Sequence, residues 1–175
     1  MRERFIVDID MDKELEYMGR DDWDIPNRED YNKYQLTQIK IGLDEGLDVS
    51  EYSDPAFNAS QMRVLRIALM YGLDISICKD SRYEDVQMIQ LLEGLDAGLD
   101  VSACLNPAFD DWQMFEIIEG VKQGVDVSIY ADPKFDRLQM SELREGLLKG
   151  VDVSACLDEN LDYLEMRKII NKLIA

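Results

Sequence analysis

The chain has 175 residues, of which 46% are hydrophobic, and its 37 acidic and 19 basic residues give a net charge of −18. This size and composition fit one ordinary domain or one short repeat array with a sizeable core. The acidity argues against direct binding to nucleic acid or to an anionic membrane, and no apolar run approaches the roughly 20 residues of a membrane span.

The first 31 residues differ from the rest of the chain and are predicted to form an N-terminal cap or arm. They open with Arg2 and other charged residues instead of the apolar block of a signal peptide, so we expect a cytoplasmic protein. Val7–Asp12 alternates apolar and acidic residues with a period of two, which is a strand pattern without a partner strand. We therefore expect an irregular or short-strand cap, followed by a short helix over Lys13–Met18 that ends at Gly19.

The acidic residues of this cap resemble the start of a calcium loop, but the match fails further on. Lys13 stands where such a loop needs glycine, and Gly19 stands where it needs glutamate. We therefore predict no metal site and no cofactor. The apolar residues that follow, Trp23, Ile25 and Pro26, are expected to cover the open end of the core.

From residue 32 to the C-terminus the sequence repeats with a period of 26 residues. The word Gly-Leu-Asp-Val-Ser begins at Gly46 and recurs with small changes at Gly72, Gly98, Gly124 and Gly150. A second word, Gln-Met or a close variant, precedes each copy by about eleven residues. A constant period of this length is typical of solenoids, so we predict an all-α fold, an α-solenoid over residues 32–175.

Each repeat is predicted to hold one long helix and one short helix. Asn58 is a suitable N-cap, and Gln61 completes a capping box with it. The same pattern places the starts of the long helices near residues 32, 58, 84, 110, 136 and 162.

The body of the long helix carries an apolar stripe. In the second repeat this stripe is predicted to be Met62, Leu65 and Leu69, and Gly72 suits the left-handed position after the last turn. A glycine four residues before that end, such as Gly42, costs about 1 kcal/mol inside a helix. Its recurrence in four repeats indicates that another group packs against the backbone there.

The segment after the long helix repeats an aspartate, a serine and a slot for cysteine or tyrosine. Asp74 and Ser76 are interpreted as caps of a short helix, because five equivalent copies argue against a tiled active site. The slot holds Cys78, Cys104 and Cys156 in three repeats and tyrosine in two, which indicates a packed, partly apolar position with free thiols.

One motif, clearest from Gly124 to Met140, reads Gly-Leu/Val-Asp-Val-Ser-x-Tyr/Cys-x-Asp-Pro-x-Phe-x-x-x-Gln-Met. It resembles a short tandem repeat of uncharacterised bacterial proteins that are often encoded near mobile elements. The resemblance covers the chain from Tyr31 onward. It implies a helical repeat fold and a bacterial origin, and it implies no catalytic residue and no activity.

Catalytic patterns are missing from this sequence, so we predict that the protein is not an enzyme. The chain has no histidine, which hydrolase triads ordinarily use as the base, and it has no glycine-rich phosphate loop. The candidate functional residues are instead those that turn apolar at positions expected to lie off the core stripe: Tyr34, Val86, Ile89, Trp112 and Phe115. Such a patch is typical of an interaction surface. The alternative is that the short helices cover these side chains.

Two non-enzymatic functions remain open from the sequence, and an enzyme stays an alternative only if the N-terminal aspartates bind a metal ion. The first is a non-enzymatic scaffold whose patch binds a protein partner or a second copy of the chain. The second is an acidic mimic of nucleic acid that occupies the basic site of a nucleic-acid-binding protein, in which case the partner is basic.

Overall fold

A computed structural model describes residues 11–18, 20 and 24–174. All regular structure in these residues is helical, which confirms the all-α prediction. Val7–Asp10, most of the predicted strand, lies outside the described residues, and Met11 and Asp12 belong to the first helix. Trp23 and Gly19 also lie outside them, whereas Ile25 is buried and Pro26 is exposed.

The chain divides into two compact units, residues 1–96 and 97–175. The predicted boundary between an N-terminal cap at 1–31 and a repeat array at 32–175 stays a prediction. Each unit is built from long helices of 12 residues, which begin at residues 33, 59, 85, 111, 137 and 163. These starts follow the predicted N-caps by one residue.

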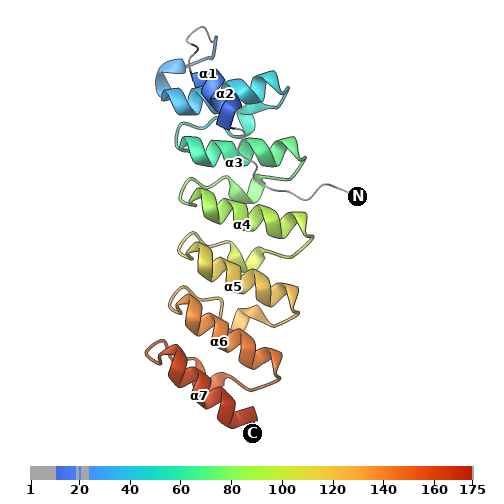
Figure 1. Cartoon of the computed structure of the whole chain (residues 1–175), viewed down its shortest axis with the longest axis vertical. Helices are drawn as coiled ribbons and strands as arrows, with labels where there is room; N and C mark the ends of the chain where they lie inside the picture. Colours follow the sequence, from blue (N-terminus) through green and yellow to red (C-terminus); the bar gives the residue numbers. More distant parts are fainter. Residues whose placement is uncertain (1–10, 19, 21–23, 175) are drawn as a thin grey trace. The chain divides into compact units, whose positions relative to one another are not determined.

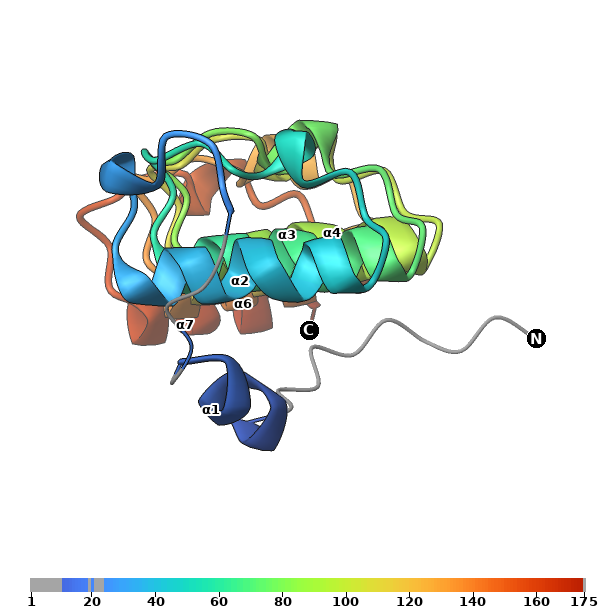
Figure 2. The same cartoon turned by 90° about the horizontal axis from the view of Figure 1, so that it is seen from above.

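The described residues of the first unit form four α-helices and three 3₁₀ helices. They are α1 (Met11–Met18), η1 (Arg28–Asp30), α2 (Lys33–Asp44), η2 (Val49–Glu51), α3 (Ala59–Met70), η3 (Ser76–Cys78) and α4 (Asp85–Asp96). The helices α2, α3 and α4 lie side by side in chain order (Figure 1). Helix α1 lies on one side of α2 and α3, and the 3₁₀ helices lie on the opposite side (Figure 2).

The second unit repeats the same plan without a counterpart of α1. It contains η4 (Ser102–Cys104), α5 (Asp111–Lys122), η5 (Val127–Ile129), α6 (Arg137–Leu148), η6 (Ser154–Cys156) and α7 (Tyr163–Ile174). The long helices again pack in chain order, α5 on α6 and α6 on α7, and each 3₁₀ helix packs on a neighbouring long helix.

Helix starts and ends follow the predicted chemistry. Complete capping boxes join Asn58 to Gln61 and recur at the starts of α2, α5 and α6. The glycines that follow the long helices have φ between 71° and 73°, the left-handed conformation. Asp74 accepts a hydrogen bond from the backbone N–H of Ser76, as four equivalent aspartates do from their serines, so the repeated Asp and Ser are local caps.

The core stripe differs from the predicted one at its last position. Met62 and Leu65 are buried as predicted, but Leu69 is only half-buried. The third buried position is instead Arg66 and its counterparts Leu92, Ile118, Arg144 and Ile170. The sequence pattern missed it because arginine occupies it in two repeats, and a charged residue is seldom fully buried without partners.

Both buried arginines have partners within their own unit. Arg144 donates from Nε to Glu116 Oε2 at 3.0 Å and from a terminal nitrogen to Gln123 Oε1 at 2.7 Å. Arg66 donates in the same way to Gln38 and Glu45 in the first unit. A charge buried with such bonds is tolerated, and removing one partner is costly.

The glutamine of each capping box also ties its helix to the turn before the next helix. Gln113 Nε2 donates to the carbonyl oxygens of Pro133 and Phe135 at 3.1 and 2.6 Å. Gln35, Gln61 and Gln139 make the same pair of bonds. The side chain therefore stabilises both a helix start and the contact between successive repeats.

Candidate protein-binding face

The third and sixth residues from each N-cap define the outer face of a long helix. They are Tyr34 and Thr37 on α2, Ser60 and Arg63 on α3, Trp112 and Phe115 on α5, and Leu138 and Ser141 on α6. This face points away from the apolar stripe because, at 3.6 residues per turn, its residues fall on the other side of the helix. In the first unit, α1 lies against it.

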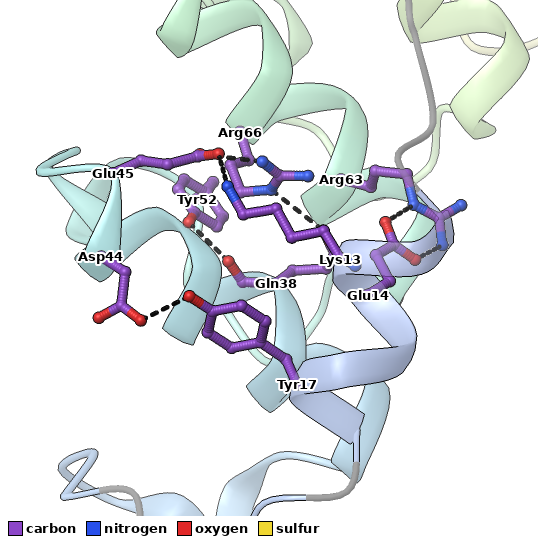
Figure 3. Close-up of polar contacts among 9 residues, drawn as sticks. All are labelled: Lys13, Glu14, Tyr17, Gln38, Asp44, Glu45, Tyr52, Arg63 and Arg66. Atoms are coloured by element: carbon purple, nitrogen blue, oxygen red, sulfur yellow. Dashed lines mark hydrogen bonds and ion pairs between the residues drawn. The ribbon is translucent and has the colours of Figure 1, made fainter.

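Helix α1 is held on the outer face by a two-bond ion pair. Arg63 donates from Nε and a terminal nitrogen to the two carboxylate oxygens of Glu14, at 2.6 and 2.5 Å (Figure 3). Glu14 is buried, whereas its neighbour Leu15 is exposed. Helix α1 therefore presents a charged side to the outer face and leaves an apolar side chain in solvent.

The other flank of α1 contacts the C-terminal end of α2. Lys13 Nζ lies 2.7 Å from Glu45 Oε1, and the second oxygen of Glu45 accepts from Arg66 at 2.9 Å (Figure 3). Tyr17 donates its hydroxyl to Asp44 at 2.7 Å. That bond raises the pKa of Tyr17, and bonds from Lys40 and then Tyr17 lower the pKa of the Asp44 carboxyl.

Where α1 lies on the outer face, the residues beneath it are shielded from solvent. Thr37 is only 1% exposed, and the adjoining Gln38, Ile41 and Val64 are also buried. A pocket of about 330 Å³ remains beside Glu14 and Tyr34. A short acidic helix therefore occupies the outer face of the first two repeats.

No described residue covers the outer face of the second unit in this way, and the face is apolar. Trp112, Phe115 and Leu138 are 52%, 38% and 40% exposed. The rings of Trp112 and Phe115 meet edge to face, with centroids 6.4 Å apart and planes at 74°. We call these three side chains the aromatic face. Phe115 stands at the place in the period where Thr37 is buried under α1.

A cation lies on the aromatic face. The guanidinium carbon of Arg137 is 4.2 Å from the centre of the Trp112 ring, a cation–π distance. Arg137 is not marked by any pattern in the sequence. It is the second residue of its repeat and Trp112 is the third of its own, so only the packing of α6 on α5 brings them together.

The other predicted residues lie in the first unit. Tyr34 and Val86 are exposed, and Ile89 is half-buried. Tyr34 lines the pocket beside α1. Val86 and Ile89 are on α4, so they belong to a different compact unit from Trp112 and Phe115.

The described residues offer little chemistry beyond binding. Burial raises the pKa of the thiols of Cys78 and Cys104 to about 12, so both are protonated and weakly nucleophilic at neutral pH. All three cysteines are free and buried. Within residues 11–18, 20 and 24–174, no cluster of three carboxylate or thiol groups is arranged to hold a metal ion.

Comparisons with known proteins returned nothing similar: no family model, no curated protein and no solved structure matches the chain. None of the helices in the described residues is long and apolar enough to cross a bilayer.

Proposed function

We propose that this protein is a non-enzymatic scaffold, an α-solenoid of 26-residue repeats that binds a protein partner on its aromatic face. The observation that carries the proposal is the contrast between Thr37 and Phe115. These residues share one place in the period, yet α1 buries Thr37 whereas Phe115 stays exposed beside Trp112. Large aromatic side chains that lie together on a surface are typical anchors of protein interfaces.

The helical architecture also supports a scaffold. The long helices start at intervals of 26 residues and pack on their chain neighbours within each unit. Repeat proteins of this kind commonly bind partners through an extended surface. The resemblance to a bacterial tandem-repeat family and the cytoplasmic location are parts of the same proposal.

The test is capture of partners from host extract by the immobilised full chain. The double variant Trp112→Ser/Phe115→Ser is compared with wild type and with the control Leu157→Ser, a similarly exposed leucine that follows η6. We expect the double variant to lose a specific protein that wild type and the control both retain. Equal capture by all three chains would contradict the proposal.

The net charge of −18 favours the second candidate, an acidic mimic of nucleic acid. A mimic would bind a basic protein, its capture would fall steeply between about 50 and 200 mM salt, and the double variant would bind normally. The scaffold predicts the reverse: a weak dependence on salt and a strong dependence on Trp112 and Phe115.

A further inference from the structure

We infer that the aromatic face binds a short acidic amphipathic helix of a partner protein, with a carboxylate of that helix paired to Arg137. The inference rests on the proposed function and names the partner's chemistry. It is unexpected for a chain with a net charge of −18, which as a whole attracts basic partners.

In the first unit, the outer face already holds one helix. Helix α1 has eight residues, among them Asp12, Glu14 and Glu16 against the single basic Lys13. It is nevertheless bound to an acidic chain: Arg63 pairs with Glu14 through two short bonds, and Lys13 and Tyr17 contact Glu45 and Asp44. Local pairing, with Arg63 accepting the acidic side of α1, therefore outweighs the net charge at this face.

Arg137 is available to pair with a carboxylate of a partner. Among the described residues it forms no ion pair with any carboxylate, and its side chain contacts the Trp112 ring. The side chain is exposed, in a chain whose acidic residues outnumber its basic ones by 37 to 19. An arginine held on an aromatic ring keeps its N–H donors directed along the surface, where an incoming carboxylate can accept two of them.

Two carboxylates close to the aromatic face in the sequence, the N-caps of α5 and α6, are already engaged. Asp110 accepts from the backbone N–H of Gln113, and Asp136 accepts from those of Leu138 and Gln139. These carboxylates are committed to helix caps. A carboxylate supplied by a partner therefore meets a cation with no competing ion pair.

The two units differ in the side chains on their outer faces. Thr37, Ser60 and Arg63 in the seat of α1 are replaced three repeats later by Phe115, Leu138 and Ser141. The polar surface under α1 is thus replaced by an apolar one. The arginine is the sixth residue counted from the N-cap in one repeat, Arg63, and the second in another, Arg137. A helix that fits here needs an apolar stripe for the aromatic face and an acidic flank for Arg137, so α1 of a second copy, with Leu15 facing away, fits poorly.

The experiment titrates the full chain with two designed peptides of about 16 residues, long enough to form a helix. Both carry the same leucine stripe at helical spacing and no tryptophan. One has glutamates flanking the stripe and the other has lysines. The protein carries Trp23→Phe, so that Trp112 is the remaining tryptophan and its fluorescence reports binding at the aromatic face. The buffer contains about 0.15 M salt to shorten long-range repulsion to roughly 8 Å.

We expect the glutamate peptide to bind about tenfold more tightly than the lysine peptide, the equivalent of one charge-assisted contact. Arg137→Glu should reverse this preference. Lys134→Glu is the matched control: it makes the same charge change three residues away, on a lysine that pairs with Asp132, and should leave the preference unchanged. Leu138→Ser should weaken both peptides, and circular dichroism verifies that each variant stays helical.

The outcomes separate the two proposals. If the lysine peptide binds Trp112 as tightly as the glutamate peptide, or if Arg137→Glu changes nothing, the inference of an acidic helix is wrong while a binding face remains. If neither peptide alters Trp112 fluorescence, and the double variant Trp112→Ser/Phe115→Ser captures the same proteins as wild type, both the inference and the proposed function are wrong.

Discussion

The hydroxyl of Tyr130 occupies the space where a side chain on Gly120 would begin. A Cβ placed on Gly120 would lie 2.0 Å from that oxygen, and one on Gly42 would lie 1.9 Å from the Tyr52 hydroxyl in the first unit. Each hydroxyl donates to a carbonyl of the preceding long helix, at 3.1 Å from Tyr130 to Glu116 and at 3.0 Å from Tyr52 to Gln38. The glycine makes room for a buried hydrogen bond, which explains its presence inside a helix.

Gly120→Ala should therefore destabilise the protein, although alanine ordinarily favours a helix over glycine by about 1 kcal/mol. Overpacking against the Tyr130 hydroxyl, and against Val127 Cγ1 at 2.7 Å, should cost about 1–3 kcal/mol, measured as a lower urea midpoint at unchanged slope. The second repeat has alanine at this helix position, Ala68, together with Cys78 in place of tyrosine, so a smaller residue at position 130 should relieve the clash. In a double-mutant cycle, Gly120→Ala should cost less in a Tyr130→Cys background. Equal costs in both backgrounds would contradict the clash.

Gln113→Glu separates the two roles of the capping-box glutamine. Glutamate can still accept from the N-cap backbone, but it cannot donate to the carbonyls of Pro133 and Phe135. We expect a loss of about 2 kcal/mol in the free energy of unfolding, because one buried and one half-buried carbonyl lose a donor and face a carboxylate. The control is Glu165→Gln in α7, where the described chain continues to no further turn, and its effect should stay within about 0.5 kcal/mol.

Glu14→Gln should release α1 from the outer face while leaving the long helices intact. The ion pair with Arg63 is largely buried, and removing the charge of one partner costs about 1.5–3 kcal/mol for such charge-assisted bonds. Hydrogen exchange should show faster exchange of the amides of Met11–Met18 and little change in α5–α7. Glu16→Gln is the matched control, because its contact with Arg20 is exposed and 3.8 Å long. Similar exchange in the two variants would show that Glu14 does not hold the helix.

Stability should fall at high pH because of the buried thiols. The folded pKa of Cys78 and Cys104 is about 12, above the value of 9.0 for an ordinary thiol, so the unfolded chain loses these protons first. The thiols therefore contribute full stability below pH 9, and this contribution is lost as pH rises from 9 toward 12. The urea midpoint of unfolding should decline between about pH 8 and 10.5. Iodoacetamide at about pH 8 should label both cysteines far more slowly in the native chain than in the unfolded chain. Rapid labelling of native Cys78 would contradict its burial.

The prediction from sequence was most complete for local structure. The starts of the long helices, the capping box at Asn58 and Gln61 and the left-handed glycine at Gly72 all followed from the repeated words, and the structure confirms them. The sequence also placed Trp112 and Phe115 off the core stripe but left open whether the short helices cover them, and the structure shows both side chains exposed. These features depend on interactions among residues a few positions apart, so the pattern along the chain is enough to specify them.

Tertiary structure alone decided which distant groups meet. The sequence showed Gln113 as a cap but not its bonds to Phe135, 22 residues away, and nothing in it joined Glu14 to Arg63 across 49 residues. The packing of α1 on the outer face and the contact of Arg137 with Trp112 were likewise not predicted from the sequence. A period of 26 residues indicates that the repeats share one local structure. The contacts between successive helices depend on side chains that packing brings within a few ångströms, and the spacing of these residues along the chain does not reveal which of them meet.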